Sequence, residues 1–169
     1  MAASYRVARS GSDVYVRVVG PASMKNVPVL DAFLRAEVEA GARRVCIDLK
    51  ACGGMDSTFM GTMVGCHKRL MEATGDGAGS LVIVNPGPSN RKLLDMLGLS
   101  SVLPVIASQV QPEMALVDLV AGETMSPMAR AELIRSAHEH LVALSEANRA
   151  KFGAFLESLK ADLKRFNGA

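Results

Sequence analysis

The most constraining feature of this chain is a strand–turn–helix segment between Val45 and Leu70. A short apolar run enters a turn with two adjacent glycines, and the turn delivers Asp56, Ser57 and Thr58 to the start of a helix-like stretch. A serine at a helix N-terminus lies where backbone N–H groups and the helix dipole favour negative charge. The segment therefore predicts an exposed hydroxyl at a place suited to gaining or losing a phosphate.

Strand-like and helix-like segments alternate from residue 5 to about residue 106. Two β-branched runs separated by Ser10-Gly11-Ser12-Asp13 indicate an antiparallel hairpin, and a continuous apolar run at 81–84 indicates a strand covered on both faces. The expected strands are 5–9, 14–19, 45–49, 81–84 and a weaker edge strand at 102–106, and the expected helices are 27–40, 58–73 and 89–97. We therefore predict an α/β domain over residues 1–110, with a mixed sheet of four to five strands packed with helices.

Residues 111–169 are expected to form a helical C-terminal extension, beginning with a short helix over 112–120. Apolar residues then recur at helical spacing from 127 to 166, with Asn148 or Gly153 as the place where a hairpin would bend. An isolated helix of this kind would leave a large apolar patch in water. The extension should therefore pack antiparallel, either on its own domain or across a homodimer, and the homodimer is the preferred alternative.

Composition excludes several classes of function. The net charge of +2, the aromatic share of 4% and the absence of Trp argue against a nucleic-acid-binding surface. No apolar run is long enough to span a bilayer and no secretory signal is visible, so a cytoplasmic location is expected. Cys46, Cys52 and Cys66 form no metal-binding pair, and Cys66 and His67 point in different directions on a helix. Neither a metal nor a cofactor is expected.

The segments from residue 5 to 106 resemble a STAS domain, the sulphate transporter and anti-sigma factor antagonist family. The resemblance rests on the order of the elements and on three short motifs: Ile47-Asp48-Leu49 leading to Asp56-Ser57, Leu81-Val-Ile-Val-Asn-Pro86, and Leu93-Leu94 followed by Leu97-Gly98-Leu99. An Asp-Ser pair after such a strand is fairly specific in this order.

The resemblance implies a binding protein without catalytic machinery. In soluble members, a serine kinase of the histidine-kinase-like ATPase type phosphorylates the serine, and a metal-dependent phosphatase removes the phosphate. The unphosphorylated protein binds that kinase, which is an anti-sigma factor, and so releases a sigma factor for transcription. The acceptor position that matches here is Ser57, with Thr58 as the alternative.

The expected partner-contact surface consists of six consecutive residues: Asp56, Ser57, Thr58, Phe59, Met60 and Gly61. The family usually has glycine two positions after the acceptor, where this chain has Phe59, and a bulky residue there is expected to alter which kinase docks. A simpler interpretation of Ser57 is a helix N-cap that contributes roughly 1 kcal/mol of stability. The alternative function is a non-phosphorylated scaffold subunit of a transporter or signalling assembly, with the helical extension as a docking arm.

The three histidines of the chain bear on whether Ser57 could be a catalytic nucleophile. Ser57 is not part of a G-x-S-x-G motif, and His67 lies about three helical turns away from it. His138 and His140 fall in the helical extension, on surfaces that are more often solvated. A serine nucleophile needs a base within reach, so we expect no enzymatic activity. Asp48 at the strand end is interpreted as a carboxylate that accepts N–H groups of the following turn.

Overall fold

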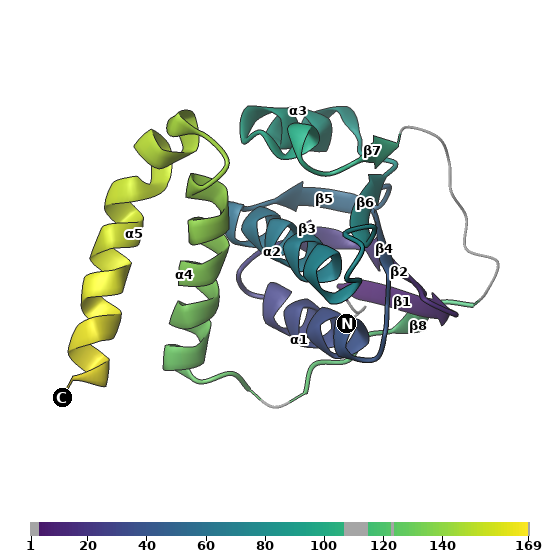
Figure 1. Ribbon diagram of the computed structural model, residues 1–169, viewed down its shortest axis with the longest axis horizontal. Helices are drawn as coiled ribbons and strands as arrows, with labels where there is room; N and C mark the ends of the chain where they lie inside the picture. The colour runs from purple at the N-terminus through teal and green to yellow at the C-terminus, as the bar shows by residue number, and fades with distance from the viewer. Residues whose placement is uncertain (1–3, 107–114, 123, 169) are drawn as a thin grey trace.

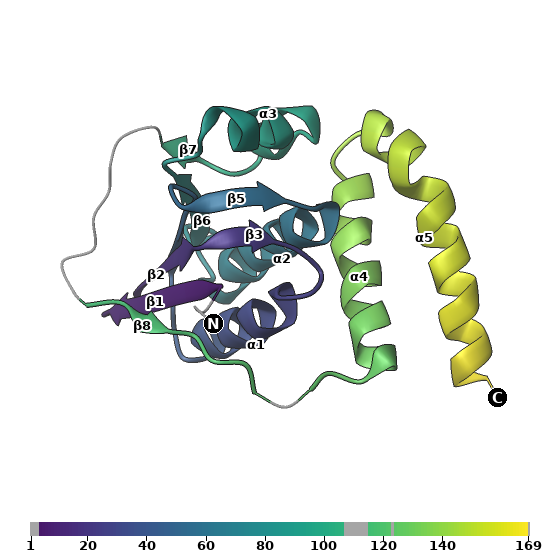
Figure 2. The same ribbon diagram turned by 180° about the vertical axis from the view of Figure 1, so that it is seen from behind.

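The computed structural model describes residues 4–106, 115–122 and 124–168, and it centres on a mixed six-stranded sheet in the order β7-β6-β4-β2-β1-β8 (Figure 1). The strands of this sheet are β1 (Tyr5–Ser10), β2 (Asp13–Val18), β4 (Arg44–Asp48), β6 (Ser80–Val84), β7 (Val105–Ile106) and β8 (Val117–Asp118). A separate two-stranded ribbon pairs β3 (Gly20–Ala22) with β5 (Cys52–Met55) (Figure 2).

The centre of the sheet is parallel and its first strands form the predicted hairpin. β1 pairs antiparallel with β2, whereas β2, β4, β6 and β7 run parallel to one another. The register aligns Val16, Ile47 and Ile83 across β2, β4 and β6, and all three are fully buried. Alternate positions of these strands therefore supply one continuous core face.

α1 (Val27–Glu39) and α2 (Ser57–Ala73) cover that core face, and α3 (Pro88–Met96) follows β6 (Figure 1). Further helical elements are the 3₁₀ turn η1 (Leu99–Ser101), α4 (Pro127–Val142) and α5 (Glu146–Asn167). α2 buries Phe59, Met63, Cys66 and Leu70, which recur every three or four residues and so lie along one stripe of the helix. The predicted α/β class with a mixed sheet and a C-terminal helical part is confirmed.

The expected helix at 112–120 is corrected by the structure. Residues 115–120 are extended and contain β8, while 112–114 lie outside the described residues. β8 pairs antiparallel with β1, and the Arg6 guanidinium donates to the Asp118 carboxylate at 3.1 Å. Pairing covers part of the free edge that β1 would otherwise present, and this long-range contact outweighs local helix preference.

α4 and α5 form an antiparallel hairpin that lies beside α2 in both views (Figures 1 and 2). Ser126 caps α4 as its position before Pro127 suggests, and Ser145 caps α5 by accepting the Asn148 N–H at 3.1 Å. The chain therefore turns before Asn148 and Gly153, the two positions expected to bend it. Within one chain, the α4–α5 hairpin packs on its own domain. The association of two copies through this hairpin stays a prediction.

Asn148 has a different role, because its buried side-chain amide ties the hairpin to the domain. It donates to the Leu97 carbonyl at 2.8 Å, just beyond α3, and to the Leu141 carbonyl at 2.9 Å in α4.

Within the described ranges, no helix is both long and apolar enough to cross a membrane.

Candidate functional site at the start of helix α2

Asp56 begins α2 and fixes its first turn. One carboxylate oxygen accepts the Phe59 N–H at 2.9 Å, and the other accepts the Met24 N–H from the loop after β3 at 2.8 Å. Asp56 is thus the N-cap, and Ser57 is the first helical residue. The interpretation of Ser57 as the cap was wrong, and its hydroxyl is left available for another role.

The Ser57 hydroxyl contacts an imidazole from the C-terminal hairpin. Its Oγ lies 3.0 Å from Nε2 of His138, and Nδ1 of His138 lies 2.8 Å from the Ile134 carbonyl oxygen. A carbonyl oxygen only accepts, so Nδ1 carries a hydrogen, and in that tautomer Nε2 accepts the Ser57 hydroxyl. The two residues are 81 positions apart in the chain.

The imidazole of His138 is enclosed rather than solvated, which corrects the expectation for this residue. Only 4% of His138 is exposed. The rings of Phe152 and Phe155 in α5 meet it edge-on, with centroids at 5.3 Å and 4.9 Å. The hairpin thereby supplies a base within hydrogen-bonding distance of Ser57, so the sequence-based argument that no base could reach it was also wrong.

The remaining residues of the expected contact surface point mainly inward. Thr58 and Met60 are each 3% exposed and Phe59 is fully buried. The Phe59 ring stacks on Tyr5 with centroids 6.4 Å apart. Phe59 therefore packs in the core, and its ring is not exposed at the expected contact surface. Its spacing from Met63 was the signal that could have shown this.

Two glycines allow α4 to approach α2 closely. A Cβ on Gly61 would lie 2.1 Å from the Ala137 carbonyl oxygen of α4. A Cβ on Gly65, one turn further along α2, would lie 2.9 Å from the His140 ring. Any larger residue at Gly61 would meet backbone atoms, so the absence of a side chain there is what permits the contact.

Asp48 anchors a buried polar network at the end of β4. Its carboxylate accepts the Lys50 N–H at 2.9 Å, as expected, and also the Tyr15 hydroxyl, the Arg17 guanidinium at 3.3 Å and the Asn85 amide at 3.1 Å. Burial opposes ionisation of Asp48, but these hydrogen bonds outweigh it and lower its pKa. This network stabilises the strand end that precedes the site.

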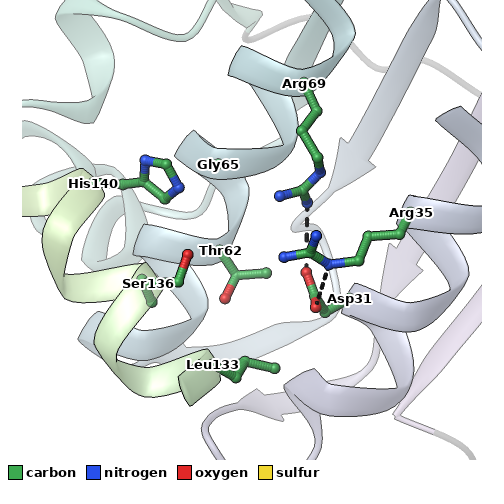
Figure 3. Close-up of a pocket in the computed structure, with 9 residues that line it drawn as sticks. Asp31, Arg35, Thr62, Gly65, Arg69, Leu133, Ser136 and His140 are labelled. Atoms are coloured by element: carbon green, nitrogen blue, oxygen red, sulfur yellow. Dashed lines mark hydrogen bonds and ion pairs between the residues drawn. The ribbon is translucent and has the colours of Figure 1, made fainter. Parts of the chain in front are cut away.

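A small polar cavity of about 10 Å³ lies where α1, α2 and α4 meet (Figure 3). Asp31 of α1 pairs with Arg35 at 2.9 Å and with Arg69 of α2 at 3.5 Å. His140 of α4 lines the same cavity. Burial is the main cause that lowers the pKa of His140, and the positive charges of Lys68, Arg69 and Arg35 lower it further. The negative charge of Glu139 opposes this effect.

We expect two histidines, His140 at this junction and His67 elsewhere on α2, to make the protein less stable in mild acid. Burial also lowers the pKa of His67, whose Nδ1 accepts the Leu81 N–H at 3.1 Å. Both histidines bind a proton less readily in the folded than in the unfolded state. Their contribution to stability is therefore complete above the unfolded pKa, near 6.5, and is lost as the pH falls through the folded values.

Thermal unfolding at pH 5.0, 6.0 and 7.5 measures this effect. The melting temperature should decrease as the pH is lowered from 7.5 to 5.0. In His140→Gln this decrease should be smaller, because glutamine does not titrate. A His140→Gln profile as steep as that of the wild type would contradict a role for His140.

No group of three or more His, Cys, Asp or Glu residues that could hold a metal ion is found in the described part of the chain. Burial raises the pKa of the Cys66 thiol to about 12 and that of Cys46 to about 11, so both stay protonated at neutral pH. Cys66 is a small buried hydrophobic residue, as expected, whereas Cys46 is only partly buried.

Comparison with known families and structures agrees with this architecture. The family model for the STAS domain matches residues 4–111. The structure of the unphosphorylated anti-sigma factor antagonist SpoIIAA superimposes with a TM-score of 0.54 and 23% identity, covering 62% of this chain and 89% of that one. An anti-sigma-factor antagonist (STAS) domain protein from Planctomyces limnophilus gives a TM-score of 0.53 and 18% identity, covering 62% and 91%.

A third structure, the Bacillus cell fate determinant SpoIIAA in its phosphorylated form, gives a TM-score of 0.50 at 23% identity and covers 62% of this chain and 92% of that one. No match is found among curated proteins. The chain belongs to the STAS domain family. Its STAS domain resembles those of anti-sigma factor antagonists, and α4 and α5 lie outside the matched region.

Proposed function

We propose that this protein is a phosphorylation-switched anti-sigma factor antagonist, with Ser57 as the phosphoacceptor. In this proposal a serine kinase of the histidine-kinase-like ATPase type phosphorylates Ser57 and a metal-dependent phosphatase removes the phosphate. The unphosphorylated protein binds the kinase, an anti-sigma factor, and so regulates sigma-factor-dependent transcription in the cytoplasm. The observation that carries the proposal is the position of Ser57 as the first residue of α2 in a STAS fold, with Asp56 and not Ser57 serving as the cap.

The structural neighbours support the same switch. SpoIIAA is described as an anti-sigma factor antagonist and has been seen in unphosphorylated and phosphorylated forms. At the start of α2, a phosphate would carry about −1.5 to −2 charges at neutral pH. The helix N-terminus tolerates that charge, whereas Asp56 and an acidic or apolar partner surface oppose it. The STAS domain would stay folded on phosphorylation, whereas the partner interface would be lost.

The Ser57–His138 pair does not change the proposal of a non-enzymatic binding module. A hydroxyl beside an oriented imidazole is the arrangement of an activated nucleophile. However, the aromatic rings of Phe152 and Phe155 contact the imidazole, and neither Ser57 nor His138 lines the cavity at the α1–α2–α4 junction. Ester hydrolysis that disappears in both Ser57→Ala and His138→Ala would overturn this part of the proposal.

The proposal is tested by intact mass and site mapping after incubation with candidate host serine kinases and Mg-ATP. Wild-type protein should gain one phosphate at Ser57, and Ser57→Ala should gain none. Ser57→Ala should remain folded at a cost of about 1–3 kcal/mol, because it leaves the buried Nε2 of His138 without its donor. Ser57→Glu should bind the same kinase more weakly than Ser57→Ala does.

Ser89 offers a matched control, because it is an exposed serine in the first turn of α3. Ser89→Ala should be phosphorylated as the wild type is. If Ser57→Ala still gains one phosphate per chain, the acceptor lies elsewhere and Thr58 is the first residue to map. Failure of every candidate kinase to modify Ser57 would favour the scaffold function instead.

A further inference from the structure

We propose that the α4–α5 hairpin is a built-in cover of the switch serine, and that a docked hairpin and a phosphorylated Ser57 exclude each other. The regulatory part of this inference rests on the proposed function of Ser57. The steric part rests on the structure alone. α4 packs against α2 (Figures 1 and 2), and its His138 occupies the hydrogen-bonding position of the Ser57 hydroxyl.

The first step in the argument is space at Ser57. Nε2 of His138 lies 3.0 Å from Oγ, which is an ordinary hydrogen-bonding distance with no room for an intervening group. A phosphoryl group adds a phosphorus and three oxygens to that same Oγ. The imidazole cannot withdraw within the closed state, because Ile134 holds its Nδ1 and the rings of Phe152 and Phe155 pack against it. A phosphoryl group on Oγ in this position therefore displaces the imidazole, and α4 with it.

The second step is the fit between the two helices. Gly61 of α2 meets the backbone of Ala137, and Gly65 meets the ring of His140. Because these contacts lie within one and two turns of Ser57, a partner that binds the first turns of α2 needs the surface that α4 now covers. The hairpin and an external partner compete for the same face of α2.

The third step is that the hairpin can leave as a unit. Its two helices are joined by a short turn and keep contacts of their own, such as the ion pair between Lys160 and Glu139 at 3.7 Å. Its polar ties to the domain include the bonds from Asn148 to Leu97 and from Arg130 to the Met24 carbonyl at 3.4 Å. Leu141 belongs to the main core, so leaving exposes apolar surface and the closed state is the resting one.

These contacts define an order of events. In the resting chain, Ser57 is held by His138 and α2 is covered. Opening of the hairpin frees the half-buried hydroxyl from His138 and exposes the α2 surface, and a phosphate added in that state prevents the hairpin from closing again. The cover thus makes modification depend on opening, and modification then keeps the hairpin open.

Four full-length proteins test the inference by hydrogen–deuterium exchange: wild type, Gly61→Ala, Gly153→Ala and a protein carrying genetically encoded phosphoserine at position 57. A Cβ at Gly61 collides with the backbone of α4, while alanine itself suits the interior of α2. Gly153→Ala is the matched control, because a Cβ there meets only Arg149 at 3.9 Å.

Residues 127–142 should exchange faster in Gly61→Ala and in the phosphoserine protein, with β4 and β6 still protected, and at the wild-type rate in Gly153→Ala. Overpacking of this kind shifts the closed–open equilibrium by roughly 5- to 150-fold. A phosphoserine protein with wild-type protection of α4 overturns the inference. If Gly61→Ala unfolds the whole chain, β4 and β6 lose protection as well, and the phosphoserine protein decides.

A kinase assay then separates this inference from the proposed function. With a host kinase and Mg-ATP, Ser57 should be phosphorylated faster in Gly61→Ala than in the wild type, by up to the same factor. If α4 is open in Gly61→Ala but Ser57 is phosphorylated at the same rate in both proteins, the hairpin does not limit phosphorylation. That result would overturn this part of the inference and leave the proposed function intact. If neither protein is phosphorylated at Ser57, the proposed function fails, and exchange alone decides whether hairpin and phosphate exclude each other.

Discussion

Replacing Asp48 with alanine is expected to lower the free energy of unfolding by about 3–5 kcal/mol, the cost of removing one partner from a buried charged pair. Only 1% of Asp48 is exposed, and its carboxylate accepts hydrogen bonds from Tyr15, Arg17, Lys50 and Asn85. Burial and the bond to Asp48 raise the pKa of Tyr15 to about 12, so the phenol remains a donor throughout the neutral range. Alanine would leave these donors without their common acceptor.

Urea unfolding of wild type, Asp48→Ala and Asp48→Asn measures this loss. Asp76→Ala is the control, because Asp76 likewise accepts a backbone N–H, from Ala78, and pairs with an arginine, Arg43, but on an exposed turn. Its unfolding midpoint should stay close to that of the wild type. An Asp48→Ala midpoint equally close to the wild type would contradict the structural role of this network.

The pH dependence of the same variants gives an independent check. Since the folded pKa of Asp48 is lowered, its contribution to stability is present above the unfolded pKa, near 3.9, and is lost as the pH falls through the folded value. Protonation of Asp48 should therefore account for part of the stability that the wild type loses in strong acid. Asp48→Asn should lack that part of the loss.

Replacing Phe59 with alanine is expected to cost about 3–5 kcal/mol, the usual price of removing a buried aromatic ring. Phe59 is fully buried and stacks on Tyr5, and burial is the main cause that raises the Tyr5 pKa. The cavity left by alanine would lie between α2 and β1. Thermal or urea unfolding measures the loss, and Phe166→Ala is the control because Phe166 is 71% exposed.

Phe59→Leu separates stability from recognition, because leucine fills much of the same space and should cost less. If Phe59 acts only from the core, Phe59→Leu should be phosphorylated at Ser57 at the wild-type rate. A large fall in that rate with little change in stability would restore Phe59 as a residue that the kinase contacts.

Local patterns were sufficient to predict the α/β class and the main strands and helices of the STAS domain, but not the β3–β5 ribbon or β8. Alternating apolar residues in the strands, the turn residues between them and the three-to-four spacing in α2 all act within a few residues of one another. The same spacing placed Phe59 on the stripe of Met63 and Leu70. The expectation that its ring is exposed followed the family position rather than this periodicity, and the structure buries the ring. At 115–120 local preference failed for another reason, since pairing with β1 decided the conformation.

The sequence by itself determined the α/β domain, the helical extension and the Asp56–Ser57 step at a helix start, because each depends on local periodicity and capping. Only the tertiary structure decided what lies over Ser57. His138 reaches it from 81 residues away, across an interface that exists because Gly61 and Gly65 lack side chains. Long-range contacts of this kind depend on how whole elements pack, and no local pattern encodes the partner that a surface residue will meet.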